Sequence, residues 1–461
     1  MINIYELVEL FGKPYNFDPN VSIEGVSIDS RESVKKKIFF AIKGRKVDAH
    51  TFLKEVFENG GVGAFIEDPS YLNLVNGKNI FLVDNVILAL GKIAKYIIEK
   101  IGKEKKKIAI TGSAGKTTTR YIINTILSKK IRTFTPVRNL NTEIGVPLSI
   151  FDIPFDVSAL IFEFGADRPG DIAYLSELVK PNIGIITNIG PAHIERFGSL
   201  EEIANTKWAL AEFLEKNNGV LIYNADDPIL QRRGKAYKGR KIGFGRGEEA
   251  NIKLVDYEDT YEGEIFSIYV NGNILKYRTR LFGISNIYNI LAAFSLTYYL
   301  FPDDIEFIKN ILYEILPVEG RLKPLKEKDF LIIDDTYNSN PLSLRHSLKV
   351  VSRFKKGKRI AVLGDMLELG ELSRIYHRDI GRDIALFKWV DVVVGIGNYI
   401  SFLIDGARDF GFKDAYYFDT EEKLLRFLAD NKTPNSTYLF KASRGMKFER
   451  LIKRFREMLN G

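Results

Sequence analysis

The chain has no cysteine among its 461 residues, which excludes disulfide bonds and thiolate metal sites. Histidine is also scarce, with four in the whole chain. Long hydrophobic runs are missing too, because charged residues such as Asp84 and Lys92 interrupt each apolar stretch well short of the roughly 20 residues that a membrane span needs. The first residues carry acids where a signal peptide would carry bases. We therefore expect a cytoplasmic protein with no membrane span.

Charge of one sign is concentrated only in short lysine-rich runs such as 35–37 and 103–107, which we interpret as solvated faces. The net charge of +8 comes from 67 basic and 59 acidic residues, which are mixed in sequence. No dense basic stripe with interleaved aromatic residues is present, which argues against nucleic-acid binding and is consistent with an anionic small-molecule substrate. The length predicts two or three domains.

The most informative stretch runs from Thr111 to Thr119 and reads Thr-Gly-Ser-Ala-Gly-Lys-Thr-Thr-Thr. An apolar run precedes it and an amphipathic helical pattern follows, the strand–turn–helix context of a phosphate-binding loop. Glycines let successive N–H groups converge, and the helix N-terminus adds partial positive charge. Ile110 stands where the longer form of this loop has glycine, so a purely structural turn is the alternative. The predicted nucleotide-binding residues are Gly112, Ser113, Ala114, Gly115, Lys116, Thr117 and Thr118.

Alternation of β-type and helical patterns predicts an α/β fold with three domains. Residues 1–105 form a small α/β unit, and residues 106–320 form a mostly parallel sheet with crossover helices. An insertion at 250–281 is predicted to be a β-hairpin that turns at Asn271-Gly272. Residues 321–461 repeat strand and helix in a doubly wound pattern.

Two polar residues follow predicted strands at the sheet edge where ligands of parallel sheets bind. Glu163 lies near the end of the run 159–164, where its carboxylate could hold a phosphate-bound metal. A solvent-facing glutamate on an edge strand is the alternative. His193 follows the run 183–188, and a structural histidine is equally compatible with that position.

Lys207 lies inside the apolar stripe of a predicted helix. The helix begins at Ser199, and Ile203, Lys207, Leu210 and Leu214 recur at helical spacing on one face. Lysine is disfavoured there. Its side chain either reaches the surface along the helix or has a lowered pKa that leaves the amine neutral enough to react.

Amides and carboxylates begin two further helices. Asn286 and Asn289 lie in the first turns of a predicted helix over 283–300, where they could bind a purine edge or cap the helix. The stretch 334–341, Asp-Asp-Thr-Tyr-Asn-Ser-Asn-Pro, ends a predicted strand with paired carboxylates and begins a helix. It could bind a ribose or a metal, or cap that helix.

Taken together, these motifs resemble the Mur ligase family of peptidoglycan synthesis, in order and over essentially the whole chain. Asp29-Ser-Arg31 and the stretch 39–52 are similar to the uridine-nucleotide-binding N-terminal domain of that family. Further matches are the stretch 139–147, Glu319-Gly-Arg321 and Lys441-Ala-Ser-Arg444-Gly. The motifs at 333–341 and 363–370 resemble those of members that add D-alanyl-D-alanine.

The resemblance implies three domains: a uridine-nucleotide-binding domain, a central ATPase-type domain with a phosphate loop, and a Rossmann-like C-terminal domain. It also implies an ATP-dependent amide ligase. ATP would phosphorylate the terminal carboxylate of a UDP-N-acetylmuramoyl tripeptide, and the amine of D-alanyl-D-alanine would attack the acyl phosphate, giving an amide, ADP and phosphate. ATP, Mg²⁺ and small-molecule substrates are the implied ligands, and a monomer is expected.

Residue roles carried over from the resemblance centre on the phosphates. Thr117 and Glu163 would hold one magnesium ion, His193 and a carbamoylated Lys207 would serve a second, and Lys116 would stabilise charge on the γ-phosphate. The remaining nucleotide-binding residues would be Asn286, Asn289, Arg321 and Asp335. The substrate-binding residues would be Ser30, Arg31, Lys43, Gly44, Asp48, His50, Asn141, Thr142 and Asn338.

Two other functions remain open at this point. One is a different amide ligase of the same fold, such as a folylpolyglutamate synthetase or a ligase that adds another residue. The other is a catalytically silent ATP-binding protein that scaffolds cell-wall enzymes. The joint presence of Lys116, Glu163, His193 and Lys207 favours an enzyme, because a scaffold needs none of them.

Overall fold

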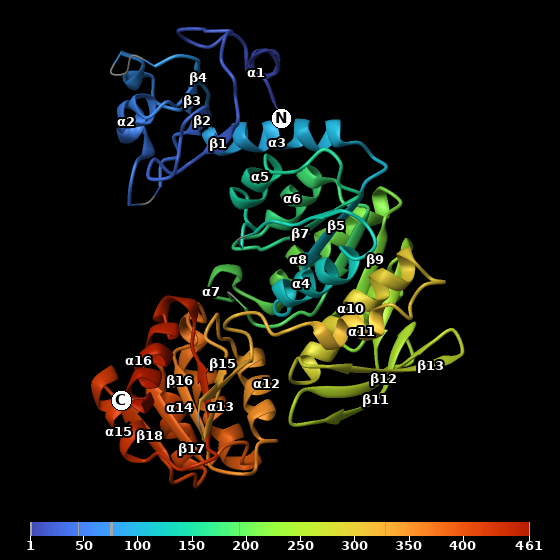
Figure 1. The fold of residues 1–461 in the computed structure, drawn as a ribbon, viewed down its shortest axis with the longest axis vertical. Coiled ribbons are helices and arrows are strands. Elements are labelled where there is room, and N and C mark those ends of the chain that lie inside the picture. Colours follow the sequence, from blue (N-terminus) through green and yellow to red (C-terminus); the bar gives the residue numbers. More distant parts are fainter. Residues whose placement is uncertain are drawn as a thin grey trace.

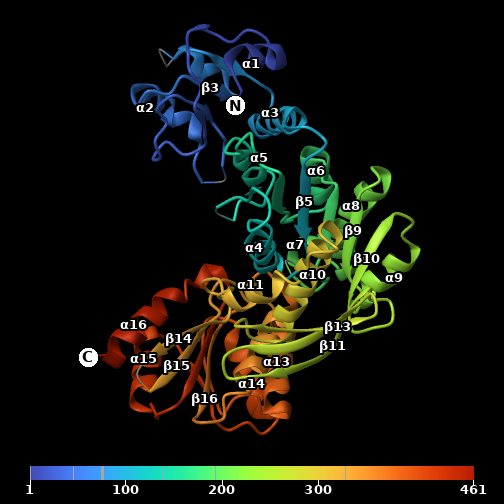
Figure 2. The same ribbon diagram turned by 45° about the vertical axis from the view of Figure 1, so that its right-hand side comes forward.

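Three separate β-sheets organise the chain into an N-terminal, a central and a C-terminal body (Figure 1). The computed structural model describes residues 2–44, 46–73, 77–137, 139–192, 194–327 and 329–460. The bodies follow one another in chain order, from blue through green to red, and the central body lies between the other two (Figures 1 and 2). This three-domain α/β architecture confirms the predicted fold class.

The N-terminal body is a four-stranded parallel sheet in the order β1-β2-β3-β4. The rings of Phe40, Phe65 and Phe81 stack across neighbouring strands with centroids 4.7–4.8 Å apart, and they form the centre of its core. Its elements are α1 (Ile4–Phe11), β1 (Gly25–Ser27), β2 (Lys37–Phe40), η1 (Ala49–Phe52), α2 (Leu53–Glu58), β3 (Gly63–Ile66), η2 (Pro69–Asn73), β4 (Ile80–Leu82) and α3 (Val86–Ile101).

Helix α3 joins the first body to the second. Asn85 caps its start by accepting a hydrogen bond from the Leu88 N–H. The helix packs on α5 (Gly145–Ile150) and α6 (Asp171–Val179) of the central body. Gly91 permits this approach, because a Cβ at that position would lie 2.1 Å from the Tyr174 hydroxyl.

The central sheet has nine strands in the order β13-β12-β11-β10-β9-β8-β5-β7-β6. Strands β5 to β11 run parallel to one another in this sheet, and β12 and β13 extend it with antiparallel pairing. The predicted hairpin is confirmed: Asn271 and Gly272 both have positive φ, 45° and 83°, as a tight hairpin turn requires. Strand β11, in the same insertion, was not part of that prediction.

Helices pack on this sheet and on each other: α10, for example, packs on α4, β9 and β10. In chain order, the remaining central elements are β5 (Lys106–Thr111), α4 (Lys116–Leu127), β6 (Thr133–Phe134), β7 (Ala159–Glu163), β8 (Ile183–Ile186), α7 (Ile194–Phe197), α8 (Leu200–Lys216), β9 (Val220–Asn224), α9 (Pro228–Ala236), β10 (Arg240–Gly245), β11 (Ile252–Asp259), β12 (Glu264–Val270), β13 (Asn273–Thr279), α10 (Ile284–Leu300) and α11 (Ile308–Glu314).

The C-terminal sheet has the order β14-β15-β19-β16-β17-β18, parallel except for the edge strand β14. This confirms the doubly wound prediction. Its elements are β14 (Lys323–Glu327), β15 (Phe330–Asp334), α12 (Pro341–Val351), β16 (Arg359–Gly364), η3 (Gly370–Leu372), α13 (Ser373–Phe387), β17 (Val392–Ile396), α14 (Ile400–Asp409), β18 (Ala415–Phe418), α15 (Glu421–Asp430), β19 (Thr437–Lys441), η4 (Arg444–Met446) and α16 (Glu449–Asn460).

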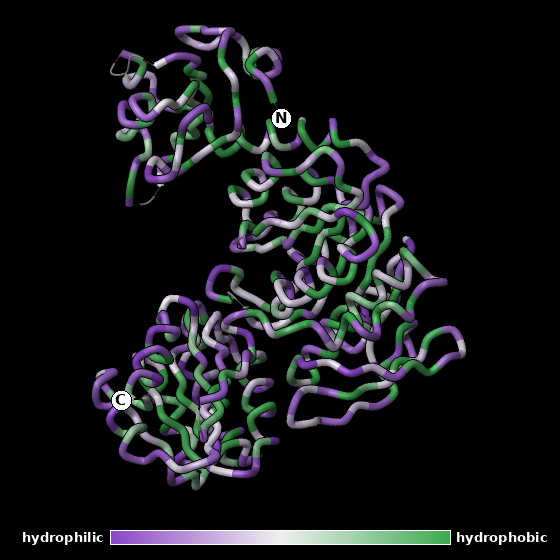
Figure 3. Tube along the Cα trace, in the orientation of Figure 1, coloured by the Kyte–Doolittle hydropathy of each residue, from purple (hydrophilic) through white to green (hydrophobic). Residues whose placement is uncertain are grey.

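Hydrophobic packing continues from the central body into the C-terminal body. Hydrophobic segments follow the strands inside the bodies, and hydrophilic segments follow the outer loops (Figure 3). Ile194 and Phe197 of the short helix α7 are buried in the same cluster as Met366 and Leu369 of the C-terminal body. Helix α7 therefore forms an apolar joint between the two bodies. Within the described ranges, no helix is long and apolar enough to cross a bilayer.

A largely buried arginine that contacts two carboxyl groups forms a second joint between these bodies. Arg353, which follows α12, places Nη2 2.7 Å from Glu264 Oε1 and 2.8 Å from Asp259 Oδ1 on the central body. Glu264 also accepts a hydrogen bond from the N–H of Gly283, the residue before α10. Burial raises the pKa of Glu264 to about 8, reinforced by its hydrogen bond with Asp259 and opposed by Arg353.

This raised pKa predicts how stability responds to pH. The folded state keeps a proton on Glu264 that the unfolded state releases near its ordinary pKa of 4.5. Proton binding at Glu264 therefore stabilises the folded state fully below pH 4.5, and this stabilisation is lost as pH rises through about 8. Relative to Glu264→Gln, the free energy of unfolding of the wild type should fall by about 1.4 kcal/mol per pH unit between about pH 5 and pH 8. Urea unfolding of both proteins at several pH values measures this slope. Parallel curves for the two proteins would contradict it.

Candidate active site

The predicted phosphate loop lies between β5 and α4. Gly112 and Gly115 have positive φ, 145° and 84°, which permits the tight backbone path. The loop is fixed to the segment after β8: Ser113 Oγ donates to Gly190 O at 2.9 Å, and the Ala114 N–H donates to Asn188 Oδ1 at 2.9 Å. The shortened glycine spacing therefore folds as the predicted strand, glycine turn and helix.

Polar groups of the loop meet the end of β7. Thr117 Oγ1 donates to Glu163 Oε2 at 2.8 Å, and Asn141 Nδ2 donates to Glu163 Oε1 at 3.0 Å. Glu163 is buried on a strand paired on both sides, so the alternative of a solvent-facing glutamate on an edge strand is wrong. Lys116 Nζ donates to Gly112 O at 2.8 Å, and burial lowers the pKa of Lys116. The sequence motif thus places a cation and a carboxylate at one sheet edge.

Lys207 of α8 is buried and does not extend to the surface. Its exposed fraction is 4%, although it lies on a helix whose ends are exposed. Burial, and secondarily the charge of Lys116, lower the pKa of Lys207 to about 7. A substantial fraction of this amine is therefore neutral near neutral pH, in agreement with the reactive alternative rather than the surface one.

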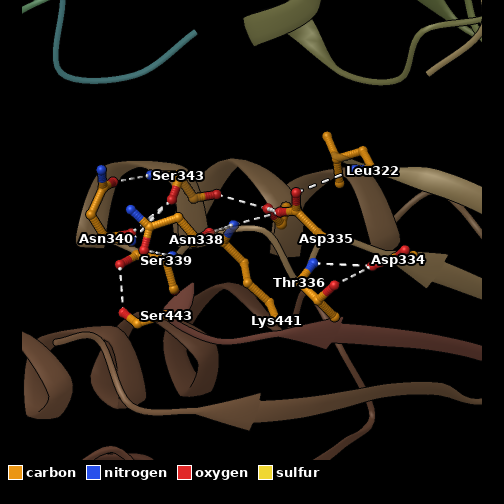
Figure 4. Close-up of polar contacts among 11 residues, drawn as sticks. Leu322, Asp334, Asp335, Thr336, Asn338, Ser339, Asn340, Ser343, Lys441 and Ser443 are labelled. Carbon is orange, nitrogen blue, oxygen red and sulfur yellow. Dashed lines mark hydrogen bonds and ion pairs between the residues drawn. The ribbon is translucent and has the colours of Figure 1, made fainter. Parts of the chain in front are cut away.

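A second polar cluster lies at the carboxyl ends of β15 and β19 (Figure 4). Asp335 Oδ2 accepts from Lys441 Nζ at 2.6 Å and from Ser347 Oγ at 2.5 Å, while Oδ1 accepts from the Leu322 N–H at 3.2 Å. Asp334 faces another way and accepts from Thr336. The two neighbouring carboxylates therefore have different hydrogen-bond partners.

The cap of α12 comes from a residue that follows these carboxylates. Asn340 makes a capping box with Ser343, so the alternative that the stretch 334–341 caps this helix is confirmed, through Asn340. The same segment supplies Asn338, whose carbonyl oxygen accepts from Lys441 Nζ at 2.9 Å.

The amides of α10 interact with each other and with the phosphate-loop helix. Asn289 Nδ2 donates to Asn286 Oδ1 at 3.0 Å, and Asn286 Nδ2 donates to Phe282 O at 2.8 Å. Thr119 Oγ1 donates to Asn289 Oδ1 at 3.3 Å. A Cβ at Gly115 would lie only 2.3 Å from Asn289 Oδ1, so the loop and α10 are in close contact.

One cavity of about 940 Å³ collects these groups between the central and C-terminal bodies. Arg321, at the start of the C-terminal body, reaches across the cavity to the central body, where its Nη2 donates to Thr117 Oγ1 at 3.0 Å. Its Nε is buried without a hydrogen-bond partner. The predicted residues that line this cavity are Gly112, Ser113, Ala114, Gly115, Lys116, Thr117, Thr118, Asn141, Thr142, Glu163, Lys207, Asn286, Asn289, Arg321, Asp335 and Asn338.

Other predicted substrate-binding residues, namely Ser30, Arg31, Lys43, Gly44, Asp48 and His50, lie in the N-terminal body and do not line this cavity. Arg31 is exposed and forms a two-point ion pair with Asp29, and that arginine holds the pKa of Asp29 at about 2. His50 is buried, its Nδ1 lies 2.6 Å from Asp48 Oδ1, and its Nε2 accepts from the Glu67 N–H. Both ring nitrogens are thus engaged within the protein.

His193 lies outside the described residues, so the structure places no ligand there. Several cavity residues were not predicted: Asn188 and Asn224 follow β8 and end β9, and Asp227 accepts from the Ile189 N–H. The rule that ligands bind at the carboxyl ends of parallel strands could have indicated them. His346 gave no sequence signal, and burial lowers its pKa to about 4, so that it is neutral.

The sheets and the cavity define a multidomain nucleotide-binding protein with a phosphate loop. Comparison with known families is consistent with this class. Residues 110–297 match the Mur ligase middle domain, and residues 320–444 match the Mur ligase glutamate ligase domain. The UDP-N-acetylmuramoyl-tripeptide--D-alanyl-D-alanine ligase of Bacillus subtilis strain 168 is 35% identical over 437 residues, covering 94% of this chain and 93% of that relative.

Solved structures give the same result. A crystal structure of MurF from Acinetobacter baumannii superposes with a TM-score of 0.90 at 29% identity, covering 99% of this chain and 98% of that chain. MurF ligase from Thermotoga maritima in complex with ADP gives a TM-score of 0.85 at 29% identity, covering 95% and 98%. The chain belongs to the Mur ligase family, which confirms the predicted resemblance.

The contact between Gly115 and Asn289 yields a matched prediction. Gly115 and Gly170 both precede helices with nearly the same left-handed backbone, φ 84° and 90°. An alanine costs about 1–2 kcal/mol in that conformation at either position. Only at Gly115 does the added Cβ approach a side chain, because nothing lies within 4 Å at Gly170. Calorimetric titration with ADP should show at least about tenfold weaker binding for Gly115→Ala and wild-type binding for Gly170→Ala. Equal affinities would show that this contact does not shape the nucleotide site.

Proposed function

We propose that this chain is the ATP-dependent ligase that joins D-alanyl-D-alanine to UDP-N-acetylmuramoyl-tripeptide in the synthesis of peptidoglycan precursors. The relatives and solved structures with this activity cover nearly the full length of the chain. The proposal also takes residues 1–105, 106–320 and 321–461 as the uridine-nucleotide, ATP and Rossmann-like domains. We also propose that the protein acts in the cytoplasm as a monomer.

The observation that carries this function is the meeting of two bodies at Thr117. Its hydroxyl donates to Glu163 and accepts from Arg321, so the phosphate loop, a strand-end carboxylate and a cross-domain guanidinium converge on one point. Phosphoryl transfer depends mainly on positioning and charge neutralisation, and this convergence supplies both.

ATP and magnesium fit the groups present. The buried, unpartnered Nε of Arg321 is a donor that suits a phosphate oxygen. The hydroxyl of Thr117 and the carboxylate of Glu163 are the hard oxygen ligands that Mg²⁺ takes alongside phosphates. Bound there, the ion would neutralise charge on the transferred phosphoryl group.

In the proposed reaction, a carboxylate oxygen of the tripeptide attacks the γ-phosphorus of ATP, and the bond to ADP breaks. The amine nitrogen of D-alanyl-D-alanine then bonds to the acyl carbon, the bond from that carbon to the phosphate oxygen breaks, and the amine loses a proton. Lys116 and Arg321 stabilise charge at the γ-phosphate. The nucleotide is bound by Asn286, Asn289 and Asp335.

Lys207 is proposed to act as a carbamate. The neutral amine attacks CO₂, a new N–C bond forms as one C–O π bond of CO₂ opens onto oxygen, and a proton leaves the nitrogen for solvent, so that an anion replaces the amine. The low pKa of Lys207, about 7, supports this step, because only the neutral amine reacts. The carbamate, with His193, would then serve a second magnesium ion.

The test is ADP release from ATP with UDP-N-acetylmuramoyl-tripeptide, with and without D-alanyl-D-alanine. We expect turnover to need both substrates. Lys207→Ala should lose at least about 100-fold in kcat, as for a group that stabilises transition-state charge, and short carboxylates such as acetate should restore part of the rate.

Lys107→Ala is the matched control for this test. Lys107 is also a buried lysine whose pKa is lowered by burial, but it lies outside the cavity. The Lys107→Ala variant should keep the wild-type kcat, and added carboxylates should not change that rate. ATP binding without turnover of any muramoyl acceptor would favour the scaffold alternative instead.

A further inference from the structure

Two arginines share one aromatic ring inside the cavity. The guanidinium carbon of Arg321 lies 4.2 Å from the centroid of Tyr337, and that of Arg444 lies 5.6 Å from the same centroid. Both distances are within the range of cation–π attraction. All three residues line the cavity. The ring therefore sets how far apart the two positive charges can be.

Most cations that line the cavity are already engaged on its walls. Lys116 donates to Gly112 O, Lys441 to Asp335 and Asn338 O, and Arg321 to Thr117. Lys207 is proposed above to become a carbamate. Among the described lining residues, Arg444 remains as a cation without a role.

The charge of Arg444 is only weakly neutralised. Its ion pair with Glu449 has an Nη1 to Oε1 distance of 3.4 Å, and the two side chains are 63% and 43% exposed. Ion pairs this exposed contribute little, because solvent and salt screen them. A ligand carboxylate can therefore compete for this guanidinium at little cost.

The backbone that carries Arg444 is firmly held. Ser443, which precedes it, donates its N–H to Asp365 O at 3.0 Å and its hydroxyl to Ser339 O at 3.2 Å. The same hydroxyl accepts from the Leu367 N–H at 2.8 Å. These contacts tie the arginine to the loops after β15 and β16, which border the cavity. A site with a fixed backbone and an adaptable charged side chain suits the capture of a small anion.

We propose that Arg444 binds the terminal carboxylate of the incoming dipeptide and that Tyr337 positions its guanidinium. The inference rests on the proposed function and names the acceptor's anchor within that site. The attacking amine must lie about 3 Å from the acyl carbon, beside the phosphate held by Arg321. A dipeptide spans about 7 Å, so its carboxylate projects away from that point. Arg444, the second cation at the shared ring, lines the same cavity and can meet this carboxylate there, and arginine can bind it through two hydrogen bonds.

The test compares D-alanyl-D-alanine with D-alanyl-D-alaninamide, which lacks the terminal charge. Steady-state ADP release gives kcat/KM for each acceptor. The wild type should prefer the acid by about 10–100-fold, the range of a charge-assisted hydrogen bond. In Arg444→Met the KM for the acid should rise by about the same factor while the KM for ATP stays unchanged, so that the preference for the acid falls to about one. Arg444→Lys, which keeps the charge but not the two-point geometry, should retain part of the preference.

Arg450→Met is the matched control. Arg450 is exposed in the same segment and does not line the cavity, so its variant should keep the wild-type preference. Turnover of the amide shows that Arg444→Met is folded. If that variant binds no ADP, Arg444→Gln, which keeps a polar side chain of similar length, supplies the same comparison.

The outcomes separate this inference from the function on which it rests. An undiminished preference for the acid in Arg444→Met overturns the anchor, and so does an equal loss for acid and amide, which indicates a structural role. A wild type that turns over neither acceptor overturns the proposed function and the anchor together.

Discussion

The candidate site depends on one buried ion pair, between Lys441 at the end of β19 and Asp335 after β15. Nζ lies 2.6 Å from Oδ2, and such a pair is favourable only when its other hydrogen-bonding groups are also satisfied. Asp335 meets this condition in part by accepting from the Leu322 N–H. Leu322 directly follows Arg321, so the contact with Asp335 holds the backbone from which the Arg321 side chain reaches Thr117. A contact inside one sheet thereby positions a group that acts on the neighbouring body.

A site built across two bodies also needs the bodies to stay in register. Helix α7 packs apolar residues against the C-terminal body. Arg353 contacts Glu264 at the start of β12, and Glu264 in turn accepts a hydrogen bond from Gly283, the residue before α10. Helix α7 follows the segment after β8 that holds the phosphate loop. The contact of Arg353 with Glu264 lies beside the turn at which α10, the helix that carries Asn286, begins. Both joints therefore connect the packing of the C-terminal body to elements that line the cavity.

Local chemistry explains what the sequence could predict. The phosphate loop, the Asn271-Gly272 turn and the burial of Lys207 follow from glycine conformation and helical spacing, which are properties of neighbouring residues. The opposite environments of Asp334 and Asp335 could not be predicted, because they depend on Lys441, which is distant in sequence. The same holds for Glu264, whose partner Arg353 comes from another body. Sequence spacing predicts strand ends, but it does not indicate which side chains from other strands will meet them.

The sharing of Tyr337 by Arg321 and Arg444 has a mechanical consequence. Tyr337 is fixed by its N–H, which donates to Gly320 O, so the ring moves with the residue before Arg321. A shift that carries Arg321 toward or away from the phosphate loop must carry the ring with it. The second cation, on η4, contacts that ring. Arg321, which reaches the phosphate loop, and Arg444 therefore contact a common ring that is hydrogen-bonded to the residue before Arg321, and through this ring the C-terminal body places two cations next to each other in the cavity.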